Sequence, residues 1–310
     1  MKQEELDIQM AKAQEVKEAN EEKILALPNV LGVGIGYKEI GGKETTELCI
    51  KVYVEKKLPQ KELSAKEIVA ETVDKIKTDV QEVGLIEALP YKNRIRPARP
   101  GYSIGHYKIT AGTFGCLVRD TCYPCRIHIL SNNHVLANSN VANIGNPILQ
   151  PGSVDGGTYP ADMIARLSRF IPIRFNNPAL YNLVDAAIAL PTNHRNVIVS
   201  VVTLGIPKGT VEAILGMSVV KSGRTTQTTA GKVIGVDVTL AVGYGGGKVA
   251  HFKNQILTTN MSQGGDSGSL LMSRADQKAT GLLFAGSSRV TVHNNIANVL
   301  IALGVEIVTT

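Results

Sequence analysis

Three short segments of the 310-residue chain carry the side chains best suited to acid–base and nucleophilic chemistry. His134 stands in a polar turn directly after an apolar run, and Asp185 heads an otherwise apolar segment. An ionised carboxylate in such a segment is costly to bury alone, so Asp185 is expected to have a partner. Ser267 lies in a glycine-rich turn ahead of another apolar run. A hydroxyl, an imidazole and a carboxylate are therefore available for one site.

These three groups can perform nucleophilic catalysis if folding brings them together. A serine hydroxyl is a weak nucleophile near neutral pH and needs a base such as His134 within hydrogen-bond reach. Asp185 would fix the imidazole tautomer and stabilise the imidazolium that forms. Glycines on both sides of Ser267 free the backbone to point amide N–H groups into one hollow, as an oxyanion hole requires. These glycines are Gly264, Gly265 and Gly268.

Charge is distributed unevenly along the chain and divides it near residue 100. Residues 1–99 hold 17 basic and 18 acidic side chains, whereas residues 100–310 hold 16 basic and 9 acidic ones. Glycine follows the same division, with 6 in the first part and 24 in the second, which indicates a many-turned β structure there. Two prolines in residues 91–101 resist helix and ladder hydrogen bonding. We therefore expect two domains, 1–99 and 100–310, joined by a linker at 91–101.

The first part is predicted to be a small α+β domain with a leading helix. Residues 4–27 are strong helix formers without glycine or proline, and Pro28 ends the run. Two alternating segments, 30–37 and 48–55, are expected to pair as a hairpin. A helix over 64–73 and a strand over 78–83 complete the prediction. Alternating glycines lie in the first strand, but no helix follows it, which argues against a dinucleotide-binding motif.

The second part is predicted to be mainly β. Its short apolar segments, separated by turn residues, are typical of a sandwich or of paired barrels. Only residues 294–303 have a helical pattern, with Gly304 as a stop. The expected strands cover residues 113–118, 126–130, 186–190, 197–203, 218–221, 231–240, 250–259, 269–272 and 279–285.

Residues 100–310 resemble the trypsin-like (chymotrypsin-fold) serine peptidases. The order histidine, aspartate, serine is that of the chymotrypsin type. Any one motif is weak, but three in this order within a β-rich domain are a specific signal. The matching segments are Gly265-Asp266-Ser267-Gly268, Asn133-His134-Val135 and Asp185-Ala-Ala-Ile-Ala, and the turn Lys221-Ser-Gly-Arg-Thr-Thr226 with Gly231-Lys-Val is similar to the cytoplasmic bacterial and plant branch.

The resemblance implies a double β-barrel with the site in the cleft between two six-stranded barrels. His134 and Asp185 would come from the first barrel and Ser267 from the second, with the amides of Gly265 and Ser267 as the oxyanion hole. It also places the substrate pocket and suggests an uncharged apolar side chain before the scissile bond. The implied pocket residues are Met261, six positions before Ser267, with Phe284 and Gly286.

Two departures from the family pattern bear on activation and compartment. Val135 follows His134 where secreted relatives carry a cysteine, so the disulfide of the histidine loop is missing. Many relatives are activated by a cut that creates a new terminus to pair with the aspartate beside the nucleophile. Here Arg96 and Arg99 both precede proline, a bond that trypsin-type enzymes cut poorly. We therefore expect Asp266 to be satisfied internally and the first domain to be retained.

Other ligands and partners have weaker support. Cys122, Cys125, His128 and His134 have the spacing of a metal site, but sharing His134 with a triad makes a metal unattractive. We expect no metal or other cofactor, and leave open whether the two cysteines pair. The basic residues of the second part are scattered, and the chain has no tryptophan and 5% aromatic residues, so specific nucleic-acid binding is not expected.

Taken together, the sequence predicts an intracellular serine endopeptidase that acts on polypeptides. No apolar run approaches the roughly 20 residues that span a bilayer, and the start lacks a secretory pattern, so we expect a cytoplasmic protein that binds no membrane. Four cysteines are too few for a disulfide scaffold. The alternative is a catalytically silent protease fold that serves as a peptide-binding scaffold. A further alternative is a self-limited protease whose first domain covers the cleft or builds a homo-oligomer.

Overall fold

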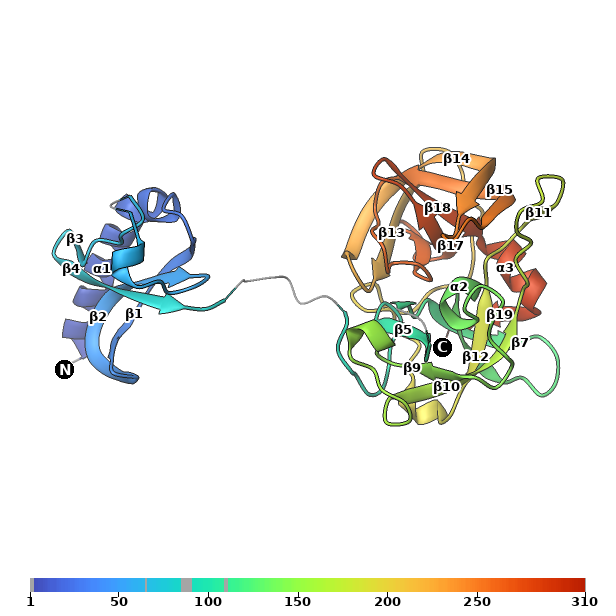
Figure 1. The fold of residues 1–310 in the computed structure, drawn as a ribbon, viewed down its shortest axis with the longest axis horizontal. Helices are drawn as coiled ribbons and strands as arrows, with labels where there is room; N and C mark the ends of the chain where they lie inside the picture. Colours follow the sequence, from blue (N-terminus) through green and yellow to red (C-terminus); the bar gives the residue numbers. More distant parts are fainter. Residues whose placement is uncertain (1–2, 65, 85–90, 109–110, 310) are drawn as a thin grey trace. The chain divides into compact units, whose positions relative to one another are not determined.

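The computed structural model describes residues 3–64, 66–84, 91–108 and 111–309. It contains two compact units, Met1–Ala88 and Leu89–Thr310, each with its own apolar core (Figure 1). The boundary therefore lies earlier in the chain than the predicted division at residues 99 and 100.

The segment predicted as a linker belongs to the second unit. Arg96 Nη2 donates hydrogen bonds to the backbone oxygens of Gln150 at 3.0 Å and Asp162 at 3.3 Å. The Ala98 amide donates to the carbonyl of Asn196 at 2.6 Å, and Ala98 is fully buried. The prolines bend this segment, but its other residues supply the hydrogen bonds that hold it against the barrel. We call residues 91–99 the strap.

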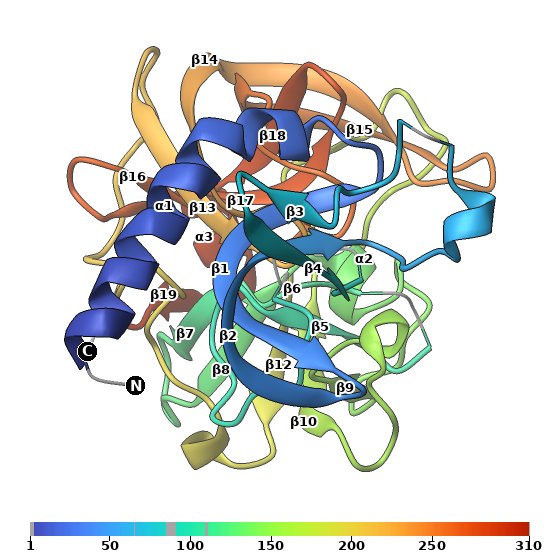
Figure 2. The same cartoon turned by 90° about the vertical axis from the view of Figure 1, so that its left-hand side faces the viewer.

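The first unit is a curved four-stranded sheet with one helix against it. Helix α1 (Gln3–Leu25) contacts the hairpin of β1 (Val30–Ile40) and β2 (Lys43–Val54), as Figure 2 shows. Ile24 joins the apolar core that β2 supplies. The sheet order is β1-β2-β4-β3, with β4 (Ile76–Glu82) parallel to β2 and antiparallel to β3 (Thr72–Val73). The predicted helix, hairpin and last strand are thus present.

The helix predicted over residues 64–73 is wrong. This stretch follows a 3-10 turn, η1 (Gln60–Glu62), and ends in strand β3. Its carbonyl groups are used by β4 instead of a helix, because Thr78 donates its amide to Glu71 and its hydroxyl to Ala70, at 2.9 and 2.6 Å. Helix propensity is overridden here by pairing with a strand.

The second unit is built on two curled sheets. Figure 1 shows them as a green sheet and an orange-to-red sheet, which meet near α2 and β5. The first sheet has the order β19-β7-β8-β12-β10-β9-β5-β6. Its strands are β5 (Ser103–His106), β6 (Gly112–Thr113), β7 (Cys116–Asp120), β8 (Ile127–Ser131), β9 (Pro147–Leu149), β10 (Met163–Phe170), β12 (Ala187–Pro191) and β19 (Val305–Ile307). Three short helical turns connect them: α2 (Asn133–Leu136), η2 (Ser153–Asp155) and η3 (His194–Asn196).

The second sheet closes on itself. Its order is β11-β15-β14-β13-β16-β17-β18, and an additional pairing of β15 with β18 completes a six-stranded barrel. The first sheet likewise has six strands between its short ends β19 and β6. The double barrel expected from the resemblance is therefore confirmed. The strands are β11 (Tyr181–Asn182), β13 (Ser218–Gly223), β14 (Gln227–Gly243), β15 (Val249–Thr259), β16 (Leu270–Ser273), β17 (Ala279–Gly286) and β18 (Val290–Asn295), and helix α3 (Ile296–Leu303) follows.

Most predicted strands are present, with one clear error. Residues 197–203 form only isolated bridges, because their amides pair with the strap and with a local turn: Ile198 donates to Ala98, and Val202 donates to Pro100. Helix α3 ends as predicted at Gly304, whose φ of 64° is left-handed. In the described ranges, no helix has both the length and the apolar character that crossing a membrane would require.

Because each unit has its own core, removing residues 1–88 should leave the second unit folded. We expect residues 89–310 to unfold in a single cooperative transition, measured by circular dichroism on heating. Removing residues 1–99 instead also deletes the strap and its hydrogen bonds with Gln150 and Asn196. A hydrogen bond from a charged donor such as Arg96 contributes roughly 1.5–3 kcal/mol and one from a neutral donor such as the Ala98 amide roughly 0.5–1.5 kcal/mol, so this shorter chain should melt at a lower temperature.

Equal melting temperatures for the two truncated chains would contradict the assignment of the strap to the second unit. The same two proteins and the full chain also test assembly through the first unit. A mass in solution that falls from oligomer to monomer on removal of residues 1–88 would support it, and an unchanged subunit number would contradict it.

Candidate functional site

His134 lies in α2, the single helical turn that follows β8. The turn is held from both sides by buried polar groups. Asn133 donates to the carbonyl of Ile171 at 2.7 Å, and its side-chain oxygen accepts the amide of Asn140 at 3.0 Å. The His134 side chain is 24% exposed, so one ring edge is buried while the other reaches solvent. Its position is therefore set by the barrel, and its ring is accessible to a ligand.

Asp185 precedes β12 and is fully buried. Its Oδ2 lies 2.5 Å from His134 Nδ1, and its Oδ1 accepts the backbone amide of His134 at 3.1 Å. Its own backbone is clamped as well: Asn294 accepts its amide at 2.9 Å, and Asn132 donates to its carbonyl at 2.7 Å. The expected partner of this carboxylate is thus His134. With Nδ1 engaged, the second ring nitrogen is left to act as a base.

Ser267 lies in the turn before β16, in the second barrel. Two contacts tie it to strand β6 of the first sheet. Its carbonyl accepts the amide of Thr113 at 2.7 Å. Gly112 lies between it and Val135: a Cβ at Gly112 would come within 2.4 Å of Val135 and 2.9 Å of the Ser267 carbonyl oxygen. Val135, the residue after His134, and the carbonyl oxygen of Ser267 therefore both pack against Gly112.

The turn around Ser267 has the backbone that an oxyanion hole needs. Gly265 has a φ of 97°, which favours glycine, and a Cβ there would lie 2.3 Å from Arg224. The amides on either side are occupied, since Asp266 donates to Gln263 and Gly268 donates to Leu283. Within the described part of the chain, no protein acceptor meets the amides of Gly265 and Ser267. These two N–H groups are available to an oxyanion.

The carboxylate next to Ser267, that of Asp266, is satisfied inside the barrel, as expected. It is fully buried and accepts the amides of Thr225 at 2.9 Å and Thr226 at 3.1 Å. Lys221 Nζ lies 3.3 Å from its Oδ2, and both side chains are fully buried. Burial lowers the pKa of Lys221, and the charge of Asp266 opposes that shift. A lysine of the same barrel therefore supplies the positive charge beside Asp266.

A second ion pair links the two barrels beside the same turn. Arg224 donates from Nε and Nη2 to the two carboxylate oxygens of Asp155, each at 2.5 Å. Asp155 lies in η2 and also accepts the hydroxyl of Ser103 at 2.6 Å. The Arg224 amide donates to Thr113 Oγ1, which in turn donates to the Gly265 carbonyl, both at 3.0 Å. The turn that contains Gly265 and Ser267 is thus connected to the first barrel.

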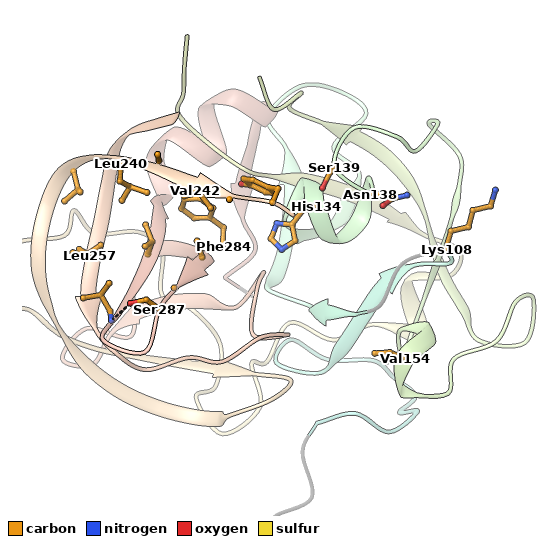
Figure 3. A pocket seen from close by; sticks show the side chains of 18 of the residues that line it. Lys108, His134, Asn138, Ser139, Val154, Leu240, Val242, Leu257, Phe284 and Ser287 are labelled. Atoms are coloured by element: carbon orange, nitrogen blue, oxygen red, sulfur yellow. Dashed lines mark hydrogen bonds between the residues drawn. The ribbon is translucent and has the colours of Figure 1, made fainter. Parts of the chain in front are cut away.

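Two adjacent hollows meet at this site. His134 lines a cleft of about 1210 Å³, and Ser267 lines a smaller hollow of about 500 Å³. The two share Ala285, Gly286 and Ser287. Figure 3 shows His134 projecting into the cleft, with Phe284, Val242 and Leu257 from the second barrel on one side and Asn138 and Val154 on the other.

The predicted pocket residues are found in different places. Gly286 lines both hollows, and Phe284 lines the larger cleft. Met261 lines neither: its side chain is 4% exposed and lies in an apolar cluster with Val219 and Ile256. The smaller hollow is lined by uncharged residues, namely Asn260, Ser262, Gln263, Gly264, Ser267, Leu283, Ala285, Gly286, Ser287 and Ser288.

Sequence reasoning missed three groups at the site. Lys221 and Arg224 lie in the turn 221–226 that contributes to the resemblance, but the sequence of this turn does not indicate their ion pairs with Asp266 and Asp155. Tyr244 carries no sequence signal beyond its glycine-rich neighbours, which are typical of a turn. β14 does end at Gly243, but the Tyr244 hydroxyl also donates to Asp185 Oδ2 at 2.8 Å. Contacts between residues so distant in the chain have no local sequence pattern.

The cysteine segment lies apart from these groups. Cys122 and Cys125 are exposed free thiols in the β7–β8 hairpin. His128 is buried and bonds to Asp120 at 3.0 Å. Among the residues that the structure describes, no cluster of three or more histidine, cysteine, aspartate or glutamate side chains is arranged to hold a metal ion.

Comparisons with known proteins show the fold. No family model and no curated protein matches the sequence. Protease A of Thermobifida fusca superposes with a TM-score of 0.50 at 19% identity, over 69% of this chain and 100% of that chain. A glutamic acid-specific serine protease that uses a histidine triad in substrate binding has a TM-score of 0.49 at 22% identity, over 68% of this chain and 100% of its own. Together with the strand order, the first likeness shows that this chain contains the chymotrypsin-like double β-barrel.

Proposed function

We propose that this protein is a serine endopeptidase with Ser267 as nucleophile, His134 as general base and Asp185 as the group that orients His134. One observation carries the proposal. The His134–Asp185 bond of 2.5 Å is made at a buried carboxylate, and Ser267 lines the hollow that adjoins the cleft containing His134. The glycine turn beside it offers two amides. These observations support a site in which Ser267 is the nucleophile, His134 the base, Asp185 the orienting group and the two amides the oxyanion donors.

These groups would cleave a peptide in two steps. Ser267 Oγ attacks the carbonyl carbon while its proton passes to His134 Nε2, and the amides of Gly265 and Ser267 stabilise the oxyanion. His134 then gives that proton to the leaving amine, and an acyl ester remains on Ser267. Water, activated by His134, hydrolyses the ester. Asp185 keeps Nδ1 protonated throughout and stabilises the imidazolium.

The buried Lys221–Asp266 pair supports activity without a cut upstream. In relatives that need processing, a new amino terminus pairs with the aspartate beside the nucleophile. Here Lys221 Nζ already lies 3.3 Å from Asp266 and also donates to the carbonyl of Gln227 at 3.1 Å. We propose that folding alone orders the nucleophile turn. The cytoplasmic location remains a prediction from the sequence.

Ser267→Ala should abolish both labelling by a fluorophosphonate probe and release of peptides from casein. The alanine removes only the attacking oxygen, so the melting temperature should stay within a few degrees of the unaltered protein. Ser168→Ala, at a half-buried serine on β10 outside both hollows, is the matched control and should label normally. A folded, unaltered protein that takes up no probe at Ser267 would favour the silent scaffold.

Lys221→Met should destabilise the protein and slow labelling of Ser267 at least tenfold. Methionine has a similar length but leaves Asp266 as a buried charge without its cation, which typically costs about 3–5 kcal/mol. Lys232→Met, at an exposed position of β14, is the control for loss of a lysine and should change stability by less than ~0.5 kcal/mol. Urea unfolding and the labelling rate measure both effects. Unchanged behaviour of Lys221→Met would contradict the role given to this pair.

A peptide library should show an uncharged apolar side chain before the cleaved bond. Among the described residues that line the smaller hollow, none carries a charge, and Leu283 and Ala285 supply apolar surface. A charged side chain would lose hydration there without gaining a partner. Mass spectrometry of the cleaved library measures the preference. Enrichment of lysine, arginine, aspartate or glutamate at that position would refute it.

A further inference from the structure

Tyr244 lies at the tip of the β14–β15 hairpin, in the second barrel. The tip is a tight turn in which Gly245, Gly246 and Gly247 all have positive φ, and Tyr244 and Lys248 close it with a backbone bond of 2.9 Å. The tyrosine ring is held by other aromatic side chains. It stands edge-on to Phe175 with centroids 5.3 Å apart, and it stacks near Phe252. The ring is therefore fixed by packing, independently of its hydroxyl.

The hydroxyl of this ring reaches the carboxylate behind the histidine. Tyr244 Oη donates to Asp185 Oδ2 at 2.8 Å, the same oxygen that lies 2.5 Å from His134 Nδ1. Its ring is also edge-on to the His134 ring, with centroids 5.9 Å apart. Burial raises the pKa of Tyr244, and the negative charge of Asp185 raises it further. The hydroxyl therefore stays protonated and acts as a donor.

We propose that Tyr244 is a positioning residue for the reaction inferred above: its hydroxyl holds the Asp185 carboxylate in the orientation that aligns His134. This inference rests on the proposed function. Among the residues that the structure describes, three donors reach the carboxylate, namely the His134 amide, His134 Nδ1 and the Tyr244 hydroxyl. Two of them belong to the residue that must be positioned. Tyr244 is the donor that can hold Oδ2 in place while the His134 ring changes its charge.

The other contacts of Asp185 cannot take over this task. Asn132 and Asn294 bind its backbone carbonyl and amide, so they fix the main chain and leave the carboxylate free to rotate. Because Asp185 is fully buried, a missing donor is not replaced by bulk water. Tyr244 also connects the two barrels, since Asp185 precedes β12 of the first barrel and Tyr244 follows β14 of the second. The alignment of the base thus depends on a hairpin that also forms a wall of the cleft.

Tyr244→Phe in the full-length protein tests the inference, because it removes the hydroxyl and keeps the ring. We expect kcat on a peptide substrate to fall about tenfold while KM changes less than about twofold, since the lost bond affects the reacting groups more than substrate contacts. Proton NMR adds a spectroscopic readout: the low-field resonance of the His134 Nδ1 proton should move further downfield, because Asp185 then shares its charge with one donor fewer. Tyr181→Phe is the control for loss of a phenol near β15 and should leave both measurements unchanged.

Each outcome decides a separate question. If the unaltered protein is not labelled by the fluorophosphonate probe, the proposed function fails, and the NMR shift alone decides the role of Tyr244. If the unaltered protein is labelled, and Tyr244→Phe has the same kcat and the same His134 Nδ1 proton resonance, the inference is overturned. If Tyr244→Phe does not fold, the unaltered protein decides: its Tyr244 hydroxyl proton should show a nuclear Overhauser effect to the His134 Nδ1 proton. A visible Nδ1 proton without that effect would overturn the inference.

Discussion

A single buried carboxylate sets the strongest constraint on this structure. An ionised aspartate shielded from water is tolerated only where donors surround it. Asp185 obtains them from His134 and Tyr244, and its backbone is held by two asparagines. These partners come from the turn that follows β8, from the β14–β15 hairpin and from the end of β18. Satisfying one charge therefore requires both barrels to be folded and correctly docked.

The turn that contains Ser267 is held by a second set of buried charges. Asp266 is neutralised from within its own barrel by Lys221, while Arg224 reaches across to Asp155 in the first barrel. Thr113 lies between these systems and bonds to the backbone of both Ser267 and Gly265. Charged groups from both barrels thus hold the backbone of this turn in place.

Local patterns predicted much of the fold and less of the site. The β1–β2 hairpin and helix α3 follow from alternation, turn glycines and a C-terminal glycine, which act over a few residues. The predictions for residues 64–73 and 197–203 were wrong because their backbone groups pair with other segments: the first stretch with the adjacent strand β4, the second with Ala98 and Pro100. The bond of His134 with Asp185 was expected from chemistry and chain order. Tyr244 could not be found in this way, because its partner lies 59 positions away and the residues around it indicate only a turn.

The strap at residues 91–99 also marks the point before which the first unit can be replaced by another protein segment. Its hydrogen bonds make it part of the barrel architecture, whereas the helix and curved sheet before it have a core of their own. A protein engineer would place a fusion junction ahead of Tyr91, replacing the upstream module with a tag or targeting sequence.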